Sequence, residues 1–415
     1  MRTELGRRVV ITGAGMVCPL GDSPAAVHDA VRQGRRGLRP LGAFPTDGLG
    51  PRLAAEVADF SPQAYLGTRN LRPLDRTAQL AASAAALALA HSGWSPEARE
   101  EQEVGLVLGT MFGSVRTIAE FDRRALVVGP EYVSPLDFAN TVINAAAGQT
   151  AIVHALRGVN STIAAGAASG LKAIGYAADL IRTGAATSVL AGGAEELSFE
   201  ALHGFERAGR LCPPEREVDG SVPFAAERCG SVLGEGAAFV MLEESEAAQA
   251  RGARVRGEVR GHGWAYAGRR DESASRSGRA LARAIRAALA SASLVPEAVD
   301  AVSSAARGSP EGDLSEACAL RLALGDHARG VPVTAVKAAL GEALGASGAM
   351  QAVLMLESIR ERFLPGIPGL DRVDPEVGLE GACAGGRAVS VHNALLTASS
   401  GDGYWGAVVL GAARS

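Results

Sequence analysis

The sequence predicts an α/β protein made of two similar halves, with helices and strands stacked in five layers, α-β-α-β-α. β-branched apolar runs alternate with helical patterns along the chain, which is typical of parallel strands covered by helices. The same order of elements recurs after residue 250, and Val189–Gly192 and Val409–Ala412 occupy matching places. Duplication of one unit explains this most simply. We therefore divide the chain into 1–250 and 251–415, and expect two sheets on either side of one central helix.

Start and stop signals place the elements of the first half. Ser23 as N-cap and Pro24 in the first turn predict a helix that runs through residue 31. An alanine-rich helix over about 75–91 is expected to end at Gly93, and residues 100–103 to form a solvated acidic turn. Strands are expected within 7–15, at 104–110 and at 186–193.

The second half repeats this alternation of strands and helices. A dinucleotide-binding turn at Gly13 and Gly15 is disfavoured, because Pro19 would break the helix that a pyrophosphate site requires. The expected strands of the second half are 255–259, 299–303, 331–336 and 405–410, and the expected helices are 278–291, 313–324 and 345–359.

Composition excludes several classes of protein. A formal charge of −4 gives no electrostatic basis for binding nucleic acid or an anionic membrane. The longest apolar run is too short to span a bilayer and no signal-peptide core precedes the first strand, so we expect a cytoplasmic protein. Five cysteines, odd in number and without CxxC spacing, argue against a disulfide framework and against a structural zinc site.

The stretch Ser161–Gly170 has the pattern of a nucleophile elbow, a strand that turns abruptly into a helix. The free N–H groups at such a helix start lower the pKa of a thiol and stabilise an oxyanion, so enzymes place Cys or Ser there. Here Ala167 occupies the tip, and a methyl group attacks nothing. A motif this small would ordinarily be interpreted as a tightly packed Gly/Ala turn. The motifs elsewhere in the chain favour a nucleophile elbow instead.

Ordered motifs along almost the whole chain resemble those of the β-ketoacyl-ACP synthases, condensing enzymes of the thiolase-like fold. Arg7–Gly21 resembles the family's opening strand and glycine turn. Pro223-Phe224 with Arg228–Ala237 resembles its Pro-Phe-Asp…Arg-Asp-Gly-Phe…Gly-Glu-Gly-Ala segment. Asp313 with Glu316 resembles the Asp-x-x-Glu that follows its first histidine motif. The resemblance implies the duplicated thiolase-like fold and condensation chemistry on acyl carrier protein.

Working members of this family use one cysteine and two histidines, and this chain has none of the three. The cysteine position of Thr-Ala-Cys-x-Ser-Gly falls on Ala167, and the histidine position of Asn-Ala-His-Gly-Thr falls on Ala305. The second histidine, in Lys-Ser-x-x-Gly-His, falls on Glu342. The family's lysine remains as Lys337, where we expect a buried ion pair with Glu342. Cys18, Cys229 and His392 are disfavoured as substitutes, because none is expected at the helix tip.

The gating segment also departs from the family. Where the family has Phe-Gly-Phe-Gly-Gly-Thr-Asn, this chain reads Ser-Ser-Gly-Asp-Gly-Tyr-Trp, so the aromatic gate and the asparagine are both lost. The altered gate comprises Ser399, Ser400, Asp402, Tyr404 and Trp405.

An intact scaffold without the triad resembles the chain length factors, which pair with an active ketosynthase α subunit in type II polyketide systems. The resemblance implies a heterodimer, an acyl carrier protein with a phosphopantetheine-bound chain as second partner, and no cofactor or metal. Phe112, Phe138 and Thr141 are then expected at the product tunnel or subunit interface. Aromatic-polyketide members usually have Gln at the cysteine position, so Ala167 makes a reduced-polyene or divergent system at least as good a match.

Two other functions stay open at this point. One is an independent homodimeric ketosynthase or decarboxylase with unusual residues, which would release CO₂ from malonyl-ACP or condense it when purified alone. The other is a scaffold that only recruits acyl carrier protein. A neighbouring gene for an intact Cys-His-His ketosynthase would favour the paired subunit over both.

Overall fold

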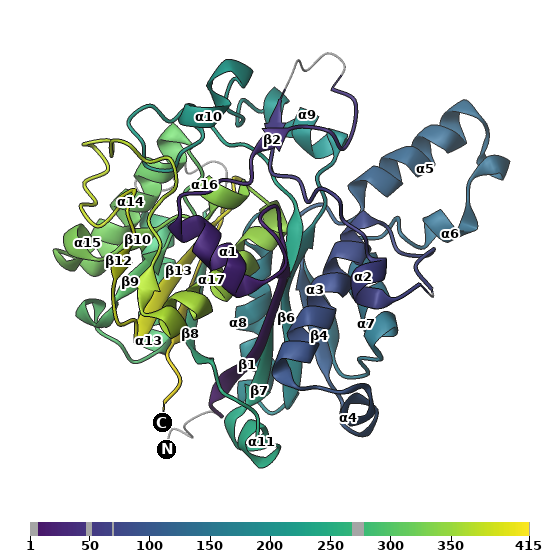
Figure 1. Cartoon of the computed structure of the whole chain (residues 1–415), viewed down its shortest axis with the longest axis horizontal. Helices are drawn as coiled ribbons and strands as arrows, with labels where there is room; N and C mark the ends of the chain where they lie inside the picture. Colours follow the sequence, from purple (N-terminus) through teal and green to yellow (C-terminus); the bar gives the residue numbers. More distant parts are fainter. Residues whose placement is uncertain (1–6, 47–51, 69, 268–277, 415) are drawn as a thin grey trace.

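The computed structural model describes residues 7–46, 52–68, 70–267 and 278–414, and its centre is a mixed sheet flanked by helices (Figure 1). Each half contributes five strands in the same spatial order and with the same strand directions, as duplication predicts. The first half runs β1 (Val9–Val17), β7 (Gly236–Glu244), β6 (Ser188–Glu195), β4 (Gly105–Gly109) and β5 (Asn160–Ile163). The second runs β8 (Gly257–Tyr266), β14 (Tyr404–Gly411), β13 (Asn393–Ser399), β9 (Ala301–Ser303) and β10 (Val333–Thr334).

Two expectations about the sheet were wrong. The strands are not all parallel, because β1 pairs antiparallel with β7 and β8 pairs antiparallel with β14. The two expected sheets are also joined into one of ten strands, since β1 pairs with β8 at Val10 with Glu258 and at Ile11 with Gly257. The sequence motifs identify strands within each half and carry no signal for this short contact between the halves.

The five-layer arrangement of helices agrees with the prediction. Helices α8 (Ser169–Arg182) and α17 (Ser347–Glu361) lie between the two halves of the sheet and share one apolar core with strands of both (Figure 1). α17 is buried on every side from Ser347 to Ser358, and most of these side chains are apolar. On the outer faces lie α3 (Arg76–Ser92) and α7 (Ala145–His154) in the first half, and α13 (Arg279–Ser291) and α14 (Pro310–Leu324) in the second.

Local signals explain most helix boundaries. The Ser23 hydroxyl accepts the Ala26 N–H, and Gly93 ends α3 in the left-handed conformation at φ 76°. The expected acidic turn at 100–103 was wrong, because Ser95 caps a short helix, α4 (Pro96–Glu101), with proline in its first turn. The remaining helices are α1 (Pro24–Arg32), α2 (Gln63–Leu66), α5 (Val115–Val127), α6 (Pro135–Phe138), α9 (Phe199–Arg207), α10 (Glu217–Gly220), α11 (Ser245–Ala250), α15 (His327–Gly330) and α16 (Lys337–Leu340).

Short elements complete the fold. Two small sheets pair β2 (Arg39–Pro40) with β3 (Leu53–Ala54) and β11 (Phe363–Leu364) with β12 (Arg387–Ala388). Single 3₁₀ turns are η1 (Pro130–Tyr132), η2 (Pro214–Arg216), η3 (Pro296–Ala298) and η4 (Leu344–Ala346). Across the described ranges, no helix is both long and apolar enough to cross a membrane.

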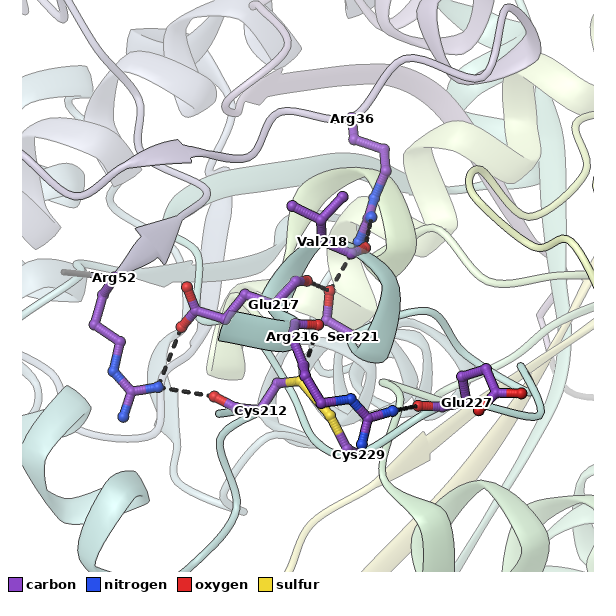
Figure 2. The surroundings of a disulfide bond; sticks show 9 residues. All are labelled: Arg36, Arg52, Cys212, Arg216, Glu217, Val218, Ser221, Glu227 and Cys229. Carbon is purple, nitrogen blue, oxygen red and sulfur yellow. Dashed lines mark hydrogen bonds and ion pairs between the residues drawn. A yellow bond between two sulfur atoms is a disulfide. The ribbon is translucent and has the colours of Figure 1, made fainter. Parts of the chain in front are cut away.

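The argument from the cysteine count against disulfides failed at one pair. Cys212 and Cys229 form a disulfide with their Cα atoms 5.2 Å apart (Figure 2). The chain brings them together because Cys212 N–H donates to the carbonyl of Ser231, two residues after Cys229. Arg52 braces the same loop by donating to the Cys212 carbonyl and by pairing with buried Glu217 at 3.2 Å. Sequence spacing alone does not reveal this long-range pairing.

Candidate functional site

The predicted elbow lies between β5 and α8. Gly166 turns the chain at φ +57°, and a Cβ at this position would lie 1.9 Å from Ser400 Oγ, so only glycine fits. The Ser169 hydroxyl accepts the Ala165 N–H at 2.8 Å and donates to the Gly166 carbonyl at 2.6 Å. These bonds fix the turn rigidly, which is what a nucleophile elbow requires.

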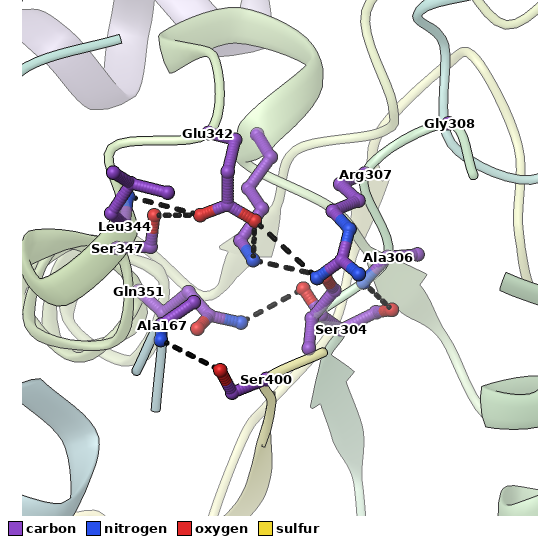
Figure 3. Close-up of polar contacts among 12 residues, drawn as sticks. Ala167, Ser304, Ala306, Arg307, Gly308, Glu342, Leu344, Ser347, Gln351 and Ser400 are labelled. Carbon is purple, nitrogen blue, oxygen red and sulfur yellow. Dashed lines mark hydrogen bonds and ion pairs between the residues drawn. The ribbon is translucent and has the colours of Figure 1, made fainter. Parts of the chain in front are cut away.

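The tip of the elbow carries no nucleophile, and its backbone N–H is already hydrogen-bonded. Ala167 is buried, 6% exposed, and its backbone N–H donates to Ser400 Oγ at 3.1 Å (Figure 3). This N–H is the group that would stabilise an oxyanion above a nucleophile at this position. The site therefore presents a methyl group in place of a nucleophile and a hydroxyl bound to the amide.

The expected ion pair between Lys337 and Glu342 forms. Lys337 Nζ lies 2.8 Å from Glu342 Oε2 and also donates to the Ala305 carbonyl at 3.0 Å. The other carboxylate oxygen of Glu342 accepts from the Leu344 N–H at 3.1 Å and from the Ser347 hydroxyl at 2.8 Å. Lys337 and Glu342 are buried, and through the Ala305 carbonyl and the Glu342 carboxylate the lysine joins two of the three positions where the sequence analysis expects a catalytic group to be missing.

The backbone N–H of Ala305 is hydrogen-bonded to a buried carboxylate. Its N–H donates to Glu316 Oε1 at 2.9 Å and to the Thr397 hydroxyl at 3.0 Å. Asp313 accepts the N–H groups of Arg307 and Gly308, each at 3.0 Å. Burial raises the pKa of both Asp313 and Glu316 above its ordinary value. The loop is thus fixed by its backbone, with no side chain at Ala305 able to exchange a proton.

The sequence analysis missed two polar residues of this site. Arg307 Nη1 lies 3.8 Å from Glu342 Oε2, and Gln351 Nε2 donates to the Ser304 carbonyl at 2.8 Å (Figure 3). Gln351 was detectable, because it is a polar residue within the apolar pattern of α17. Arg307 carried no signal, since its contact with Glu342 depends on the tertiary fold.

The five altered gate residues are placed differently. Ser400 contacts Ala167, and a Cβ at Gly166 would also meet Asp402 Oδ1 at 2.8 Å, so both line the turn. Tyr404 begins β14 beneath the Lys172 ammonium, 5.1 Å from the ring centre. The remaining two are Ser399, half-buried at the end of β13, and Trp405, buried in the apolar core of the second half.

The predicted tunnel residues lie in two separate places. Phe112 is half-buried, its ring centre 6.5 Å from that of Phe205 on α9, and its N–H donates to Glu195 at 2.9 Å. Phe138 ends α6, is 64% exposed, and packs its ring 5.8 Å from that of Phe121 on α5. The Thr141 hydroxyl donates to the Phe138 carbonyl at 2.8 Å.

Around Phe138, α5 and α6 project from the body of the molecule (Figure 1). This region carries a set of exposed apolar side chains that we call the α5–α6 face. It comprises Leu126, Val127, Val128, Tyr132, Leu136, Phe138 and Val142. Each of these side chains is at least 46% exposed, with Leu126 at 87%, and a concentration of exposed apolar side chains in one region is typical of interaction sites.

Cys18 is not available as a nucleophile in this structure. Burial raises the pKa of the Cys18 thiol to about 12, so this cysteine stays protonated and unreactive. Within the described ranges, no three His, Cys, Asp or Glu residues gather where they could hold a metal ion.

Comparisons with known proteins match this architecture. The family models "Beta-ketoacyl synthase, N-terminal domain" and "Beta-ketoacyl synthase, C-terminal domain" match residues 6–248 and 256–371. The chain is 33% identical over 376 residues to a 3-oxoacyl-[acyl-carrier-protein] synthase 2 of Vibrio cholerae, covering 90% of each protein. It is 32% identical over 413 residues to the granaticin polyketide putative beta-ketoacyl synthase 1 of Streptomyces violaceoruber, covering 97% of this chain and 98% of the relative.

A solved structure is also similar. The ishigamide ketosynthase/chain length factor superimposes with a TM-score of 0.91 at 30% identity, covering 99% of this chain and 100% of that one. The likeness extends over both halves of the sheet and the central helices between them.

Proposed function

The chain belongs to the β-ketoacyl synthase family, and on that basis we propose that it is a non-catalytic subunit that pairs with an active ketosynthase. In this pair the partner supplies the thiolate and both imidazoles for decarboxylative condensation on acyl carrier protein. This chain supplies part of the wall of the product tunnel and so limits polyketide chain length. The growing chain stays attached to the phosphopantetheine arm or to the partner's cysteine.

The observation that best supports a non-catalytic role is the elbow, where Ala167 stands at the tip in place of a nucleophile. The Ala167 N–H is bound to Ser400, and Lys337 pairs with Glu342, the residue at which the sequence analysis expects the second histidine to be missing. Condensation needs a nucleophile to hold the acyl chain and proton-transfer groups beside it. A chain that keeps the elbow's backbone geometry while losing all of these groups is useful beside a competent partner.

The α5–α6 face supports pairing. Its exposed apolar side chains would be costly to leave in water, and a second subunit is the simplest cover for them. At the sheet edge of the same half, β5 pairs with β4 on one side, and its outer edge offers backbone groups to a further strand. One similar structure is itself named as a ketosynthase with a chain length factor.

Co-expression with an intact Cys-His-His ketosynthase encoded beside this chain tests the pairing. We expect a 1:1 complex by size-exclusion chromatography with light scattering, and a higher yield of this chain than when it is expressed alone. A stable homodimer that ignores the co-expressed ketosynthase would contradict a paired subunit.

A catalytic assay of the lone chain separates the other functions. The similar Vibrio cholerae protein is named as a synthase, so activity of the lone chain is the main alternative. We expect neither CO₂ release from malonyl-ACP nor condensation without the partner. Either activity would support an independent enzyme, whereas carrier-protein binding without pairing would support a scaffold.

A further inference from the structure

A buried carboxylate at the end of β6 joins three segments of the chain beside the elbow. Glu195 is fully buried, and its Oε1 accepts the Phe112 N–H at 2.9 Å and the Thr110 hydroxyl at 3.1 Å. Its Oε2 accepts the Met111 N–H at 2.6 Å and the Gly345 N–H at 3.0 Å. The carboxylate therefore ties the end of β6 to the segment after β4 and to η4.

These hydrogen bonds suit an ionised carboxylate, because all four partners donate and both oxygens accept. Burial raises the pKa of Glu195 to about 7, and the hydrogen bonds from the N–H groups of Met111, Phe112 and Gly345 oppose that rise. Hydrogen bonds to an ionised oxygen are about twice as strong as those between neutral groups. Above this pKa the four donors are thus held more firmly than a neutral acceptor would hold them.

The elbow is packed against the same group of contacts. Ser169 Oγ, which fixes the elbow turn, also lies 3.0 Å from the Thr110 carbonyl oxygen. A Cβ at Gly345 would lie 2.6 Å from Glu195 Oε2, and one at Gly170 would lie 2.4 Å from the Gly345 carbonyl oxygen. Because these backbones touch so closely, a shift of the segment after β4 would displace its neighbours.

Phe112 is the large aromatic side chain whose backbone Glu195 holds. Its ring packs on a small apolar cluster that includes Phe205 of α9 and Leu344, the residue before Gly345. Glu195 thus fixes the backbone on two sides of this cluster, at Phe112 and next to Leu344.

We propose that Glu195 is a positioning residue for product length, because its carboxylate holds Phe112 against the growing polyketide chain. This inference rests on the proposed function, in which Phe112 lines the product tunnel. A ring whose own N–H and preceding N–H are both fixed yields less to a growing chain than a ring held by apolar contacts alone. Without the carboxylate the Phe112 backbone is free to shift, and the tunnel accepts a longer chain.

Glu195→Gln tests this role in the complex with the native partner, at about pH 8, above the Glu195 pKa. Glutamine has nearly the same size but a single acceptor oxygen, so some of the four donors lose their partner. We expect the main product, measured by mass spectrometry, to be longer by at least one extension unit, with a condensation rate within about tenfold of native.

Asp300→Asn is the matched control. Asp300 Oδ2 also accepts two backbone N–H groups, those of His392 and Asn393, but in the second half of the chain. This variant should leave the product length unchanged.

The Phe112→Ala background separates positioning from a general loosening of the fold. If Glu195 acts through Phe112, Glu195→Gln lengthens the product of the native chain and adds nothing in Phe112→Ala. An equal added shift in both backgrounds would overturn the proposal, and so would a Phe112→Ala complex with native product length. If Glu195→Gln does not fold, Thr110→Val removes the hydroxyl contact to Glu195, and the same comparison in the two backgrounds decides.

Failure of this inference is distinct from failure of the proposed function. A native chain that forms no complex with a ketosynthase contradicts the proposed function before any variant is compared. Unchanged product length in a Glu195→Gln complex of native yield overturns only the role of Glu195.

Discussion

At the scale of single residues, Ala167 is only one of the positions that would have to change for the elbow to catalyse condensation. Replacing Ala167 by Cys would restore a thiol at the start of α8, where the helix lowers its pKa. The Ala167 N–H would still be bound to Ser400, and both imidazoles would still be absent. General acid and base groups contribute about 10²–10⁴-fold each, so Ala167→Cys alone should not catalyse condensation.

Radiolabelled malonyl-ACP and an acyl-ACP donor measure this outcome, with the active ketosynthase as positive control. Detectable condensation by the variant without a partner would show that the missing histidine positions have been misassigned.

The Lys337–Glu342 pair makes a second prediction at this scale. Lys337→Met leaves a buried carboxylate without its close cation, and breaking a buried pair in this way costs about 3–5 kcal/mol. We expect a loss of this order in the free energy of unfolding, measured with urea. The double variant Lys337→Met/Glu342→Leu should be more stable than Lys337→Met, since neither charge is then left unpaired.

The exposed pair Arg116–Glu120 on α5 provides the matched control. Its atoms are 3.0 Å apart but solvated, so Arg116→Met should change stability by less than about 1 kcal/mol. Equal losses in the free energy of unfolding for Lys337→Met and Arg116→Met would contradict a larger contribution from the buried pair.

Glu196 should make stability depend on pH. Burial, with repulsion from Asp75, raises its pKa from 4.5 to about 8, so folding favours the protonated carboxyl. Its stabilising effect is complete below pH 4.5 and is lost as the pH rises towards 8. Relative to Glu196→Gln, which stays neutral, the native chain should therefore lose stability between pH 5 and pH 8. Urea unfolding at both values measures the difference, and parallel pH profiles would contradict it.

At the scale of elements, α6 connects the exposed face with the proposed control of chain length. Phe138 is exposed in this chain and packs on Phe121, so Phe138→Ala should leave the fold intact. Under the proposal that Phe138 lines the product tunnel, this variant in complex with the native partner should lengthen the product distribution, because a large side chain is removed. The condensation rate should stay within about tenfold, since no catalytic group is touched.

Mass spectrometry of the products measures their length, and Phe112→Ala is the companion variant because Phe112 lies elsewhere, against α9. Unchanged product lengths in both complexes would remove both residues from the tunnel. A complex that no longer forms would instead place Phe138 in the subunit contact alone.

Elements with strong local signals were predictable from the sequence. Ser23 and Gly93 mark helix ends through their own side chain or backbone, and α1 and α3 begin and end within a residue or two of expectation. The elbow was also predictable, since a turn of small residues around Gly166 comes directly before a segment with apolar residues at helical spacing. The contacts of Ser400 and Arg307, and the Cys212–Cys229 bond, were not predictable because each joins segments far apart in the chain.

At the scale of the whole molecule, the two halves share one core. Leu171 and Ile174 of α8 belong to the same apolar cluster as Leu396 and Val408 of the second half. β1 and β8 add direct hydrogen bonds between the halves. We therefore do not expect the proposed division at residue 250 to produce two units that unfold independently.

Tryptophan fluorescence can test this cooperativity, because the three tryptophans lie in different parts of the core. Trp94 packs in the core of the first half and Trp405 in that of the second. Variants that keep only Trp94 or only Trp405, with Phe at the other positions, report on each half separately. Because α8 and α17 are covered from both sides, loss of either half exposes their apolar surface. The urea unfolding midpoints of the two variants should therefore coincide with each other and with the midpoint measured by circular dichroism. Separated midpoints would mean that each half holds its central helix without the other.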